Sequence, residues 1–149
     1  MSLIMKKLML IGKTGSGKTT LYQRLASRNL KYEKTQAIEF HNHIIDTPGE
    51  YLENRRYYSA LQVTSTGADV VALVLDCKDK SSSYPPGFAS MFNKPTVGII
   101  SKIDLIGNDD DYHRAEKSLR LSGIDQIFKI SSLNNQGVEN LIKFLQSVE

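Results

Sequence analysis

The sequence predicts an α/β fold in which a mainly parallel sheet carries helices on both faces and one antiparallel strand at its edge. Apolar strand-like runs alternate with amphipathic helical patterns along the chain. Two short runs, 37–40 and 43–46, flank His41-Asn42 and predict a hairpin, which supplies the antiparallel edge strand. The 149 residues, 40% of them hydrophobic, are enough for one domain with a buried core, so residues 1–149 are expected to form a single domain.

The remaining strands follow from apolar runs. Residues 68–76 are almost continuously apolar and rich in valine, as expected for a strand that is buried on both faces. Shorter runs of the same type occur at 6–11, 95–100 and 127–130. With the two hairpin strands, these four runs predict six strands.

Three segments have helical periodicity. Apolar residues within 21–25 follow a glycine-rich turn, and those within 112–119 precede Gly123, which is expected to end that helix. The clearest amphipathic stripe spans 138–148. Each helix would cover a face of the sheet.

Composition excludes several classes of function. The net charge is +3 and the basic residues are scattered, which argues against a nucleic-acid-binding surface. The longest strongly apolar stretch, 70–75, is far shorter than a membrane span. Cys77 is the single cysteine, so an intrachain disulfide is excluded and a cytoplasmic location is expected. Residues 1–4 are expected to be disordered or extraneous to the domain, with Met5 as a natural start.

A phosphate-binding motif lies in the glycine-rich turn. Gly12, four further residues and Gly17-Lys18-Thr19 match the P-loop pattern, which follows a strand and opens a helix. Backbone N–H groups of this loop would surround nucleotide phosphates, Lys18 would reach the β- and γ-oxygens, and the Thr19 hydroxyl would bind Mg²⁺. The nucleotide-binding residues expected here are Gly12, Thr14, Gly15, Ser16, Gly17, Lys18, Thr19 and Thr20.

A second motif supplies further metal and phosphate contacts. Asp46-Thr47-Pro48-Gly49 follows the second hairpin strand, so Asp46 would lie at the carboxyl end of the sheet and bind Mg²⁺ directly or through water. Gly49 would bring its N–H close to a γ-phosphate because it has no side chain. The hydroxyl of Thr35 would complete the metal shell of Thr19, Thr35 and Asp46.

Two strand ends carry residues suited to a guanine base. Asp104, in Ser101-Lys102-Ile103-Asp104, would accept two N–H bonds from the base while the stem of Lys102 packs on the ring. Backbone N–H groups of Ser131, Ser132 and Leu133 would meet a base oxygen. These residues favour GTP, with ATP as the alternative.

The order of these motifs resembles the five sequence boxes of Ras-like small GTPases. Longer strings, including Lys34-Thr35-Gln36, 46–56 and 85–92, are similar to the EutP/PduV family of ethanolamine- and propanediol-utilisation proteins. The resemblance implies a Ras-like three-layer α/β/α sandwich in the bacterial cytoplasm, associated with a microcompartment through a shell or enzyme partner. Neither membrane nor nucleic acid is an expected partner, and the chain is expected to be a monomer or weak dimer.

Three positions depart from the pattern of Ras-like proteins. Ser101 replaces the usual Asn, whose side chain ties the base loop to the P-loop and touches the ring. Because serine reaches less far, a lower base affinity is expected, and Leu133 in place of the usual Lys is expected to remove one base-stacking contact. Glu50 stands where Gln is usual, and either activates the attacking water or repels the γ-phosphate. The expected catalytic residues are therefore Lys18, Thr35 and Glu50, with slow turnover. An arginine finger from Arg55 or Arg56 is the alternative to a solvated surface pair.

Three functions stay open at this point. The first is a GTP-hydrolysing switch. The second is an ATP-dependent phosphotransferase that acts on a small carboxylate such as acetate. The third is a nucleotide-binding assembly module with negligible catalysis, because fold alone does not decide function.

Overall fold

The computed structural model describes residues 3–25, 38–41, 43–81 and 84–148. Its strands are β1 (Leu3–Met5), β2 (Leu8–Ile11), β3 (Glu39–His41), β4 (Ile44–Asp46), β5 (Val70–Asp76), β6 (Thr96–Ser101), β7 (Ile127–Lys129) and β8 (Gln146–Val148). Its α-helices are α1 (Lys18–Leu25), α2 (Glu50–Glu53), α3 (Tyr58–Ser65), α4 (Asp109–Leu121) and α5 (Val138–Leu145). Short 3₁₀ helices are η1 (Arg55–Tyr57), η2 (Phe88–Met91) and η3 (Ile103–Leu105).

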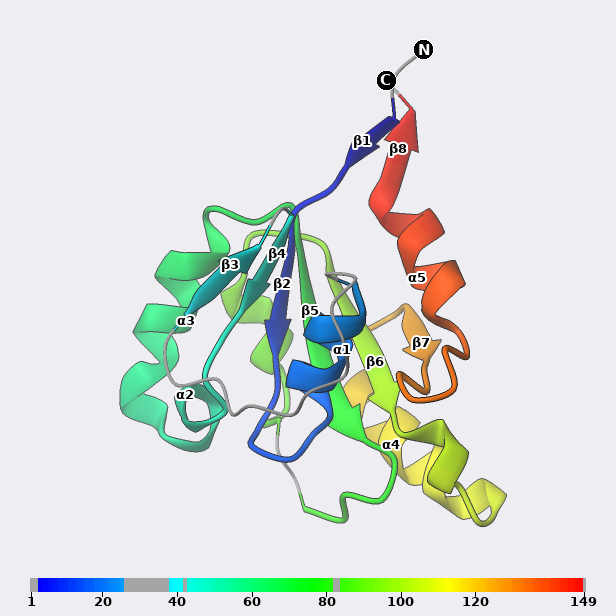
Figure 1. Ribbon diagram of the computed structural model, residues 1–149. Coiled ribbons are helices and arrows are strands. Elements are labelled where there is room, and N and C mark those ends of the chain that lie inside the picture. Colours follow the sequence, from blue (N-terminus) through cyan, green and yellow to red (C-terminus); the bar gives the residue numbers. More distant parts are fainter. Residues whose placement is uncertain (1–2, 26–37, 42, 82–83, 149) are drawn as a thin grey trace.

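The main sheet has six strands in the order β3-β4-β2-β5-β6-β7 (Figure 1). β3 runs antiparallel to β4 at one edge, and the other neighbours are parallel. This confirms the predicted six-stranded sheet with one antiparallel edge strand. Because the other strands are parallel, the loops that follow them gather at one end of the sheet, where a ligand site is expected.

Alternating side chains of the central strands fill two separate cores. Leu8 and Leu10 of β2 pack with α1 and α5 on one face. Met9 and Ile11 pack on the other face, in the core that includes residues of α2, α3 and α4. Successive side chains of a strand point to opposite faces of the sheet, so both faces are apolar and both are covered by helices. The result is the three-layer sandwich of Ras-like proteins.

The last two elements differ from the sequence prediction. The predicted helix at 138–148 ends at Leu145, because the carbonyl of Leu145 accepts the N–H of Lys6 at 2.7 Å. The following residues form β8, which pairs antiparallel with β1 in a ribbon that projects from the sheet end opposite the P-loop (Figure 1). β1 includes Leu3 and Ile4, which belong to the segment 1–4 that the sequence prediction set apart from the domain.

The helix α4 ends before Gly123, as its sequence predicts, and Asn108 caps its start. The side chain of Asn108 accepts hydrogen bonds from the N–H groups of Asp110 and Asp111 at the helix start. Gly123 follows the helix with φ of +106°, a conformation that favours glycine. Within the described part of the chain, no helix has both the length and the apolar character that crossing a membrane demands.

Candidate functional site

The P-loop joins β2 to α1 and lines a cavity of about 180 Å³ at the carboxyl end of the sheet. Gly15 and Gly17 have φ of +86° and +91°, so the loop needs glycine at both positions. The cavity lining contains all but one of the predicted P-loop residues, together with Gly49 and Lys102. Gly12 lies beneath the loop instead, where an added Cβ would be 2.6 Å from the hydroxyl of Ser16.

Three lysines that line the cavity each pair with an aspartate that ends a strand or follows one. The pairs are Lys13–Asp79, Lys18–Asp46 and Lys102–Asp76, with N–O distances of 3.0, 2.5 and 3.1 Å. The Lys18–Asp46 pair is the most buried, with side chains 4% and 0% exposed. A phosphate that reached Lys18 would therefore compete with Asp46 for the ammonium group.

The segment 46–53 lies directly against the P-loop. An added Cβ at Gly49 would lie 2.4 Å from the backbone nitrogen of Thr14, so glycine alone permits this approach. The Thr14 hydroxyl also donates to Glu53 at 3.1 Å. Thr47 donates to the carbonyl of Leu10 at 2.7 Å, which fastens the segment to β2. The sequence did not single out Glu53, because no motif marks a contact of this kind.

The predicted metal ligands are only partly described. Asp46 is buried at the end of β4, and Thr19 lies in the P-loop cavity. Their hydroxyl and carboxylate oxygens have the hard donor chemistry that Mg²⁺ prefers. Thr35 lies outside the described residues. Glu50, at the start of α2, is exposed.

A second cavity, of about 250 Å³, adjoins the P-loop at the predicted base site. Its lining residues are Gly17, Thr20, Ser101, Lys102, Asp104, Leu105, Ser132 and Leu133. Gly17, Thr20 and Lys102 belong to both cavities, so the two form one continuous cleft. Leu105 and Leu133 are 52% and 65% exposed, and give this end an apolar rim.

Hydrogen bonds hold the base-side residues in place. The Ser131 hydroxyl donates to Asp104 at 2.7 Å, and the Lys102 ammonium donates to the carbonyl of Gly15 at 2.6 Å. The Ser101 hydroxyl donates to the carbonyl of Ser16. Serine at this position therefore still bridges the base loop and the P-loop, and the lower base affinity expected from it stays a prediction.

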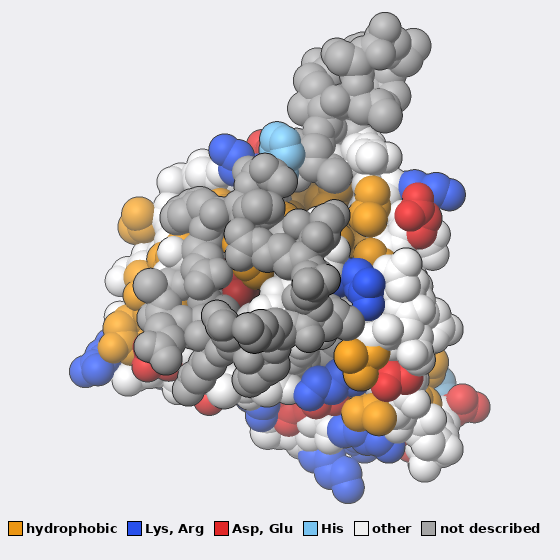
Figure 2. Space-filling view, in the orientation of Figure 1, with side chains coloured by type: hydrophobic (Ala, Val, Ile, Leu, Met, Phe, Trp, Pro, Cys, Tyr) orange, Lys and Arg blue, Asp and Glu red, His pale blue; other side chains and the backbone are white. Residues whose placement is uncertain are grey.

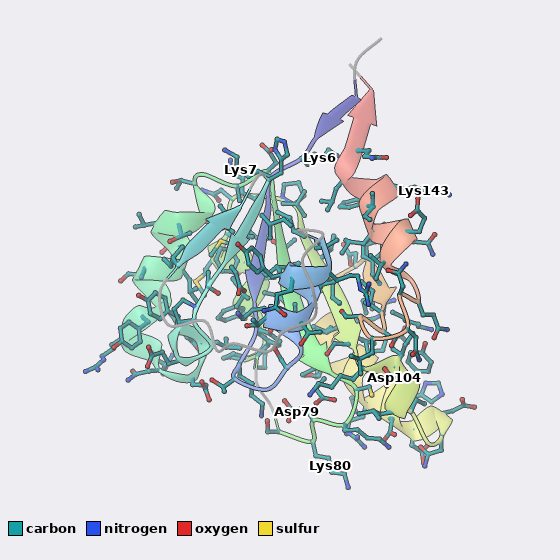
Figure 3. All side chains as sticks on the ribbon, viewed as in Figure 1. Lys6, Lys7, Asp79, Lys80, Asp104 and Lys143 are labelled. Atoms are coloured by element: carbon teal, nitrogen blue, oxygen red, sulfur yellow. The ribbon has the colours of Figure 1, made fainter. Side chains whose placement is uncertain are left out.

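Figure 3 places Asp104 and Asp79 at the same end of the molecule, whereas Lys6, Lys7 and Lys143 lie toward the other end. Figure 2 shows acidic and basic side chains intermixed along this lower part of the surface. Both signs of charge therefore occur at this end of the molecule, and within the cleft itself the lysines pair with aspartates.

Two other groups of interest, Cys77 and the pair Arg55 and Arg56, do not line either cavity. Cys77 is fully buried, and burial raises the pKa of its thiol, which disfavours a reactive thiolate. Arg55 and Arg56 are both exposed, and the Arg56 guanidinium lies 5.0 Å from the ring centroid of Tyr57.

The fold and the cleft together define a class: the protein is a P-loop NTPase with the Ras-like arrangement of strands. A family described as "Ethanolamine utilisation - propanediol utilisation" matches residues 5–147, and the chain belongs to this EutP/PduV family.

The relatives agree with this assignment. The chain is 42% identical to the propanediol utilization protein PduV of Citrobacter freundii, over 97% of this chain and 96% of the relative. It is 35% identical to a protein of Escherichia coli K12 named probable acetate kinase EutP, over 97% and 91%. A more distant match, 28% identical, covers 91% of this chain and 49% of GTPase Era of Agrobacterium fabrum.

Proposed function

We propose that this protein binds GTP with Mg²⁺, hydrolyses it slowly and acts as a nucleotide-dependent switch in ethanolamine or propanediol utilisation. The observation that carries the proposal is Asp104, whose carboxylate lines the base cavity and is held there by Ser131. A carboxylate can accept bonds from two neighbouring N–H groups of guanine, and adenine offers no such pair. The match to a GTPase of another family supports the same reading.

The phosphate end supports the triphosphate part of the proposal. The Lys18 ammonium would move from Asp46 to the β- and γ-oxygens, and the Gly49 N–H would approach the γ-phosphate. Thr19, Thr35 and Asp46 would hold Mg²⁺, which supplies charge neutralisation on the phosphates when bound. The segment 46–53 would then respond to the γ-phosphate, as switch segments of GTPases do.

Slow turnover follows from Glu50. An ionised carboxylate close to the γ-phosphate meets like-charge repulsion that a neutral glutamine would avoid. A partner or a second copy of the chain would speed the reaction, with Arg55 or Arg56 as the group that neutralises the developing charge. A shell or enzyme component of a microcompartment is the partner that the family setting favours.

A second candidate function is transfer of the γ-phosphoryl group of ATP to acetate. It is favoured by the relatives from Escherichia coli and Salmonella typhimurium, both named probable acetate kinases and each 35% identical to this chain. The cleft has lysines that would neutralise such an acid, although each of them already contacts an aspartate.

One experiment separates these functions. Purified protein is incubated with Mg²⁺ and either GTP or ATP, with and without acetate, and both inorganic phosphate and acetyl phosphate are measured. The proposal expects slow phosphate release from GTP that acetate does not alter. Formation of acetyl phosphate from ATP would contradict it and establish the second candidate. Tight binding without any product would instead indicate an assembly module.

A further inference from the structure

Arg24 links the helix that follows the P-loop to the loop that lines the base cavity. Its Nε donates to the carbonyl of Ser132 at 2.9 Å, and its terminal nitrogen approaches the carbonyl of Leu133 at 3.4 Å. Arg24 is half-buried and belongs to α1, and it lies 108 residues before Ser132 in the sequence. No sequence motif marks it.

The loop that Arg24 contacts buries Ser131 and Ser132 but leaves Leu133 exposed. Leu133 is 65% exposed, so burial does not fix its position. Where the loop begins and ends, the backbones of Ser131 and Gln136 form two hydrogen bonds of 2.9 Å with each other, which close the loop. The Asn134 N–H also donates to the Ser131 hydroxyl at 3.2 Å. The Arg24 bonds act on the two residues between these contacts, Ser132 and Leu133.

Because the peptide bond is planar, a contact that holds its carbonyl also fixes the direction of its N–H. The carbonyl of Ser132 and the N–H of Leu133 belong to one trans peptide, so they point in opposite directions. A guanidinium that holds the carbonyl on the α1 side fixes the direction of that N–H. Ser132 and Leu133 both line the base cavity, which makes this peptide a donor for a base oxygen.

We propose that Arg24 is a positioning residue for base recognition: it orients the peptide groups at Ser132 and Leu133 that receive the 6-oxo oxygen of guanine. The inference rests on the proposed function, because it concerns the base of the same nucleotide. It assigns the two edges of the base to two different residues. Asp104 recognises the N1–H and 2-amino edge of guanine, and Arg24 acts through the backbone on the 6-oxo edge.

The test compares three diphosphates by calorimetry: GDP, IDP, which lacks the 2-amino group, and 2-aminopurine riboside diphosphate, which lacks the 6-oxo group together with the N1–H. The comparison of GDP with IDP therefore also shows whether the Asp104 contact itself has changed. The variant is Arg24→Met, which removes both hydrogen bonds and keeps an apolar stem. The expected result is that the preference for GDP over the 2-aminopurine nucleotide falls about three- to tenfold, as for a lost neutral hydrogen bond. The preference for GDP over IDP, which reports Asp104, stays unchanged.

The matched control is Arg120→Met. Arg120 of α4 also donates to a backbone carbonyl, that of Asp125 at 2.9 Å, and neither residue lines the base cavity. This control should leave all three affinities at the wild-type values. If Arg24→Met weakens all three nucleotides equally, or none, the positioning role is overturned while guanine binding stands. If the wild-type protein binds GDP no more tightly than IDP and the 2-aminopurine nucleotide, the proposed function fails together with the inference.

Discussion

The phosphate end and the base end of the cleft are held by different kinds of interaction. At the phosphate end, Lys18 is paired with the carboxylate of Asp46, a contact between two buried charges. At the base end, hydroxyl groups bridge the loops: Ser101 donates to Ser16, and Ser131 donates to Asp104. In the proposed binding mode, Lys18 would exchange Asp46 for the phosphates, whereas Asp104 would keep its bond to Ser131.

The largest effect is expected from Lys18→Met. Nucleotide affinity should fall by at least about 100-fold, because the ammonium is lost and Asp46 is left buried without this partner. The affinities of GDP and GTP are measured by calorimetry, and folding is followed by thermal melting. The double variant Lys18→Met/Asp46→Asn separates the two causes. It should regain stability without regaining binding, and recovery of binding would contradict the role of Lys18.

The base end is tested by Asp104→Asn. The amide can accept one hydrogen bond and donate one, whereas guanine requires two acceptors. GDP affinity should therefore fall about 10- to 100-fold, while binding of xanthosine diphosphate, which carries an oxygen at the 2-position, should improve. Asp125→Asn, at an exposed position outside the base cavity, serves as the control. Equal loss for both nucleotides would show that Asp104 does not read the base.

A pair of glycine variants tests the contact between the P-loop and the segment 46–53. The new Cβ of Gly49→Ala would lie 2.4 Å from the nitrogen of Thr14, so the segment must move away. GTP turnover should fall about 10-fold or more because the N–H at this position is displaced. The control, Gly67→Ala, places its Cβ 3.6 Å from the carbonyl oxygen of Thr64, an ordinary contact, and should leave GTP turnover unchanged. Equal GTP turnover in both variants would show that Gly49 does not contribute to the phosphate site.

The smallest effect is expected from Glu50→Gln. Removing one exposed negative charge should raise the affinity for GTP relative to GDP about two- to fivefold, and added salt should reduce the difference. Both affinities are measured at low and high ionic strength. A ratio that stays constant would show that Glu50 does not repel the γ-phosphate, and a large fall in turnover would favour its role in activating water.

The sequence predicted the parts of the site that are local. Gly15 and Gly17 of the P-loop are marked by spacing, and Asp46 and Asp104 were placed by the rule that parallel strands end at one edge of the sheet. The antiparallel edge strand and the end of α4 were also predicted, because turn residues signal both.

The remaining contacts were not predictable because they join side chains to distant backbone. Arg24 contacts a loop 108 residues away, and nothing in its surroundings in the sequence distinguishes it from a surface arginine. The bond from Ser101 to Ser16 was not predicted because only the length of the serine side chain was considered, without the close approach of the Ser16 backbone. The helix at 138–148 was predicted too long because the pairing of Lys6 with Leu145 overrides local helical preference.

The central claim, a guanine nucleotide at this cleft, is tested most directly by titrating the wild-type protein with GDP and ADP under identical conditions with Mg²⁺. GDP is expected to bind at least about 10-fold more tightly than ADP, since the Asp104 carboxylate gains two N–H partners from guanine. Equal affinities, or tighter binding of ADP, would contradict it.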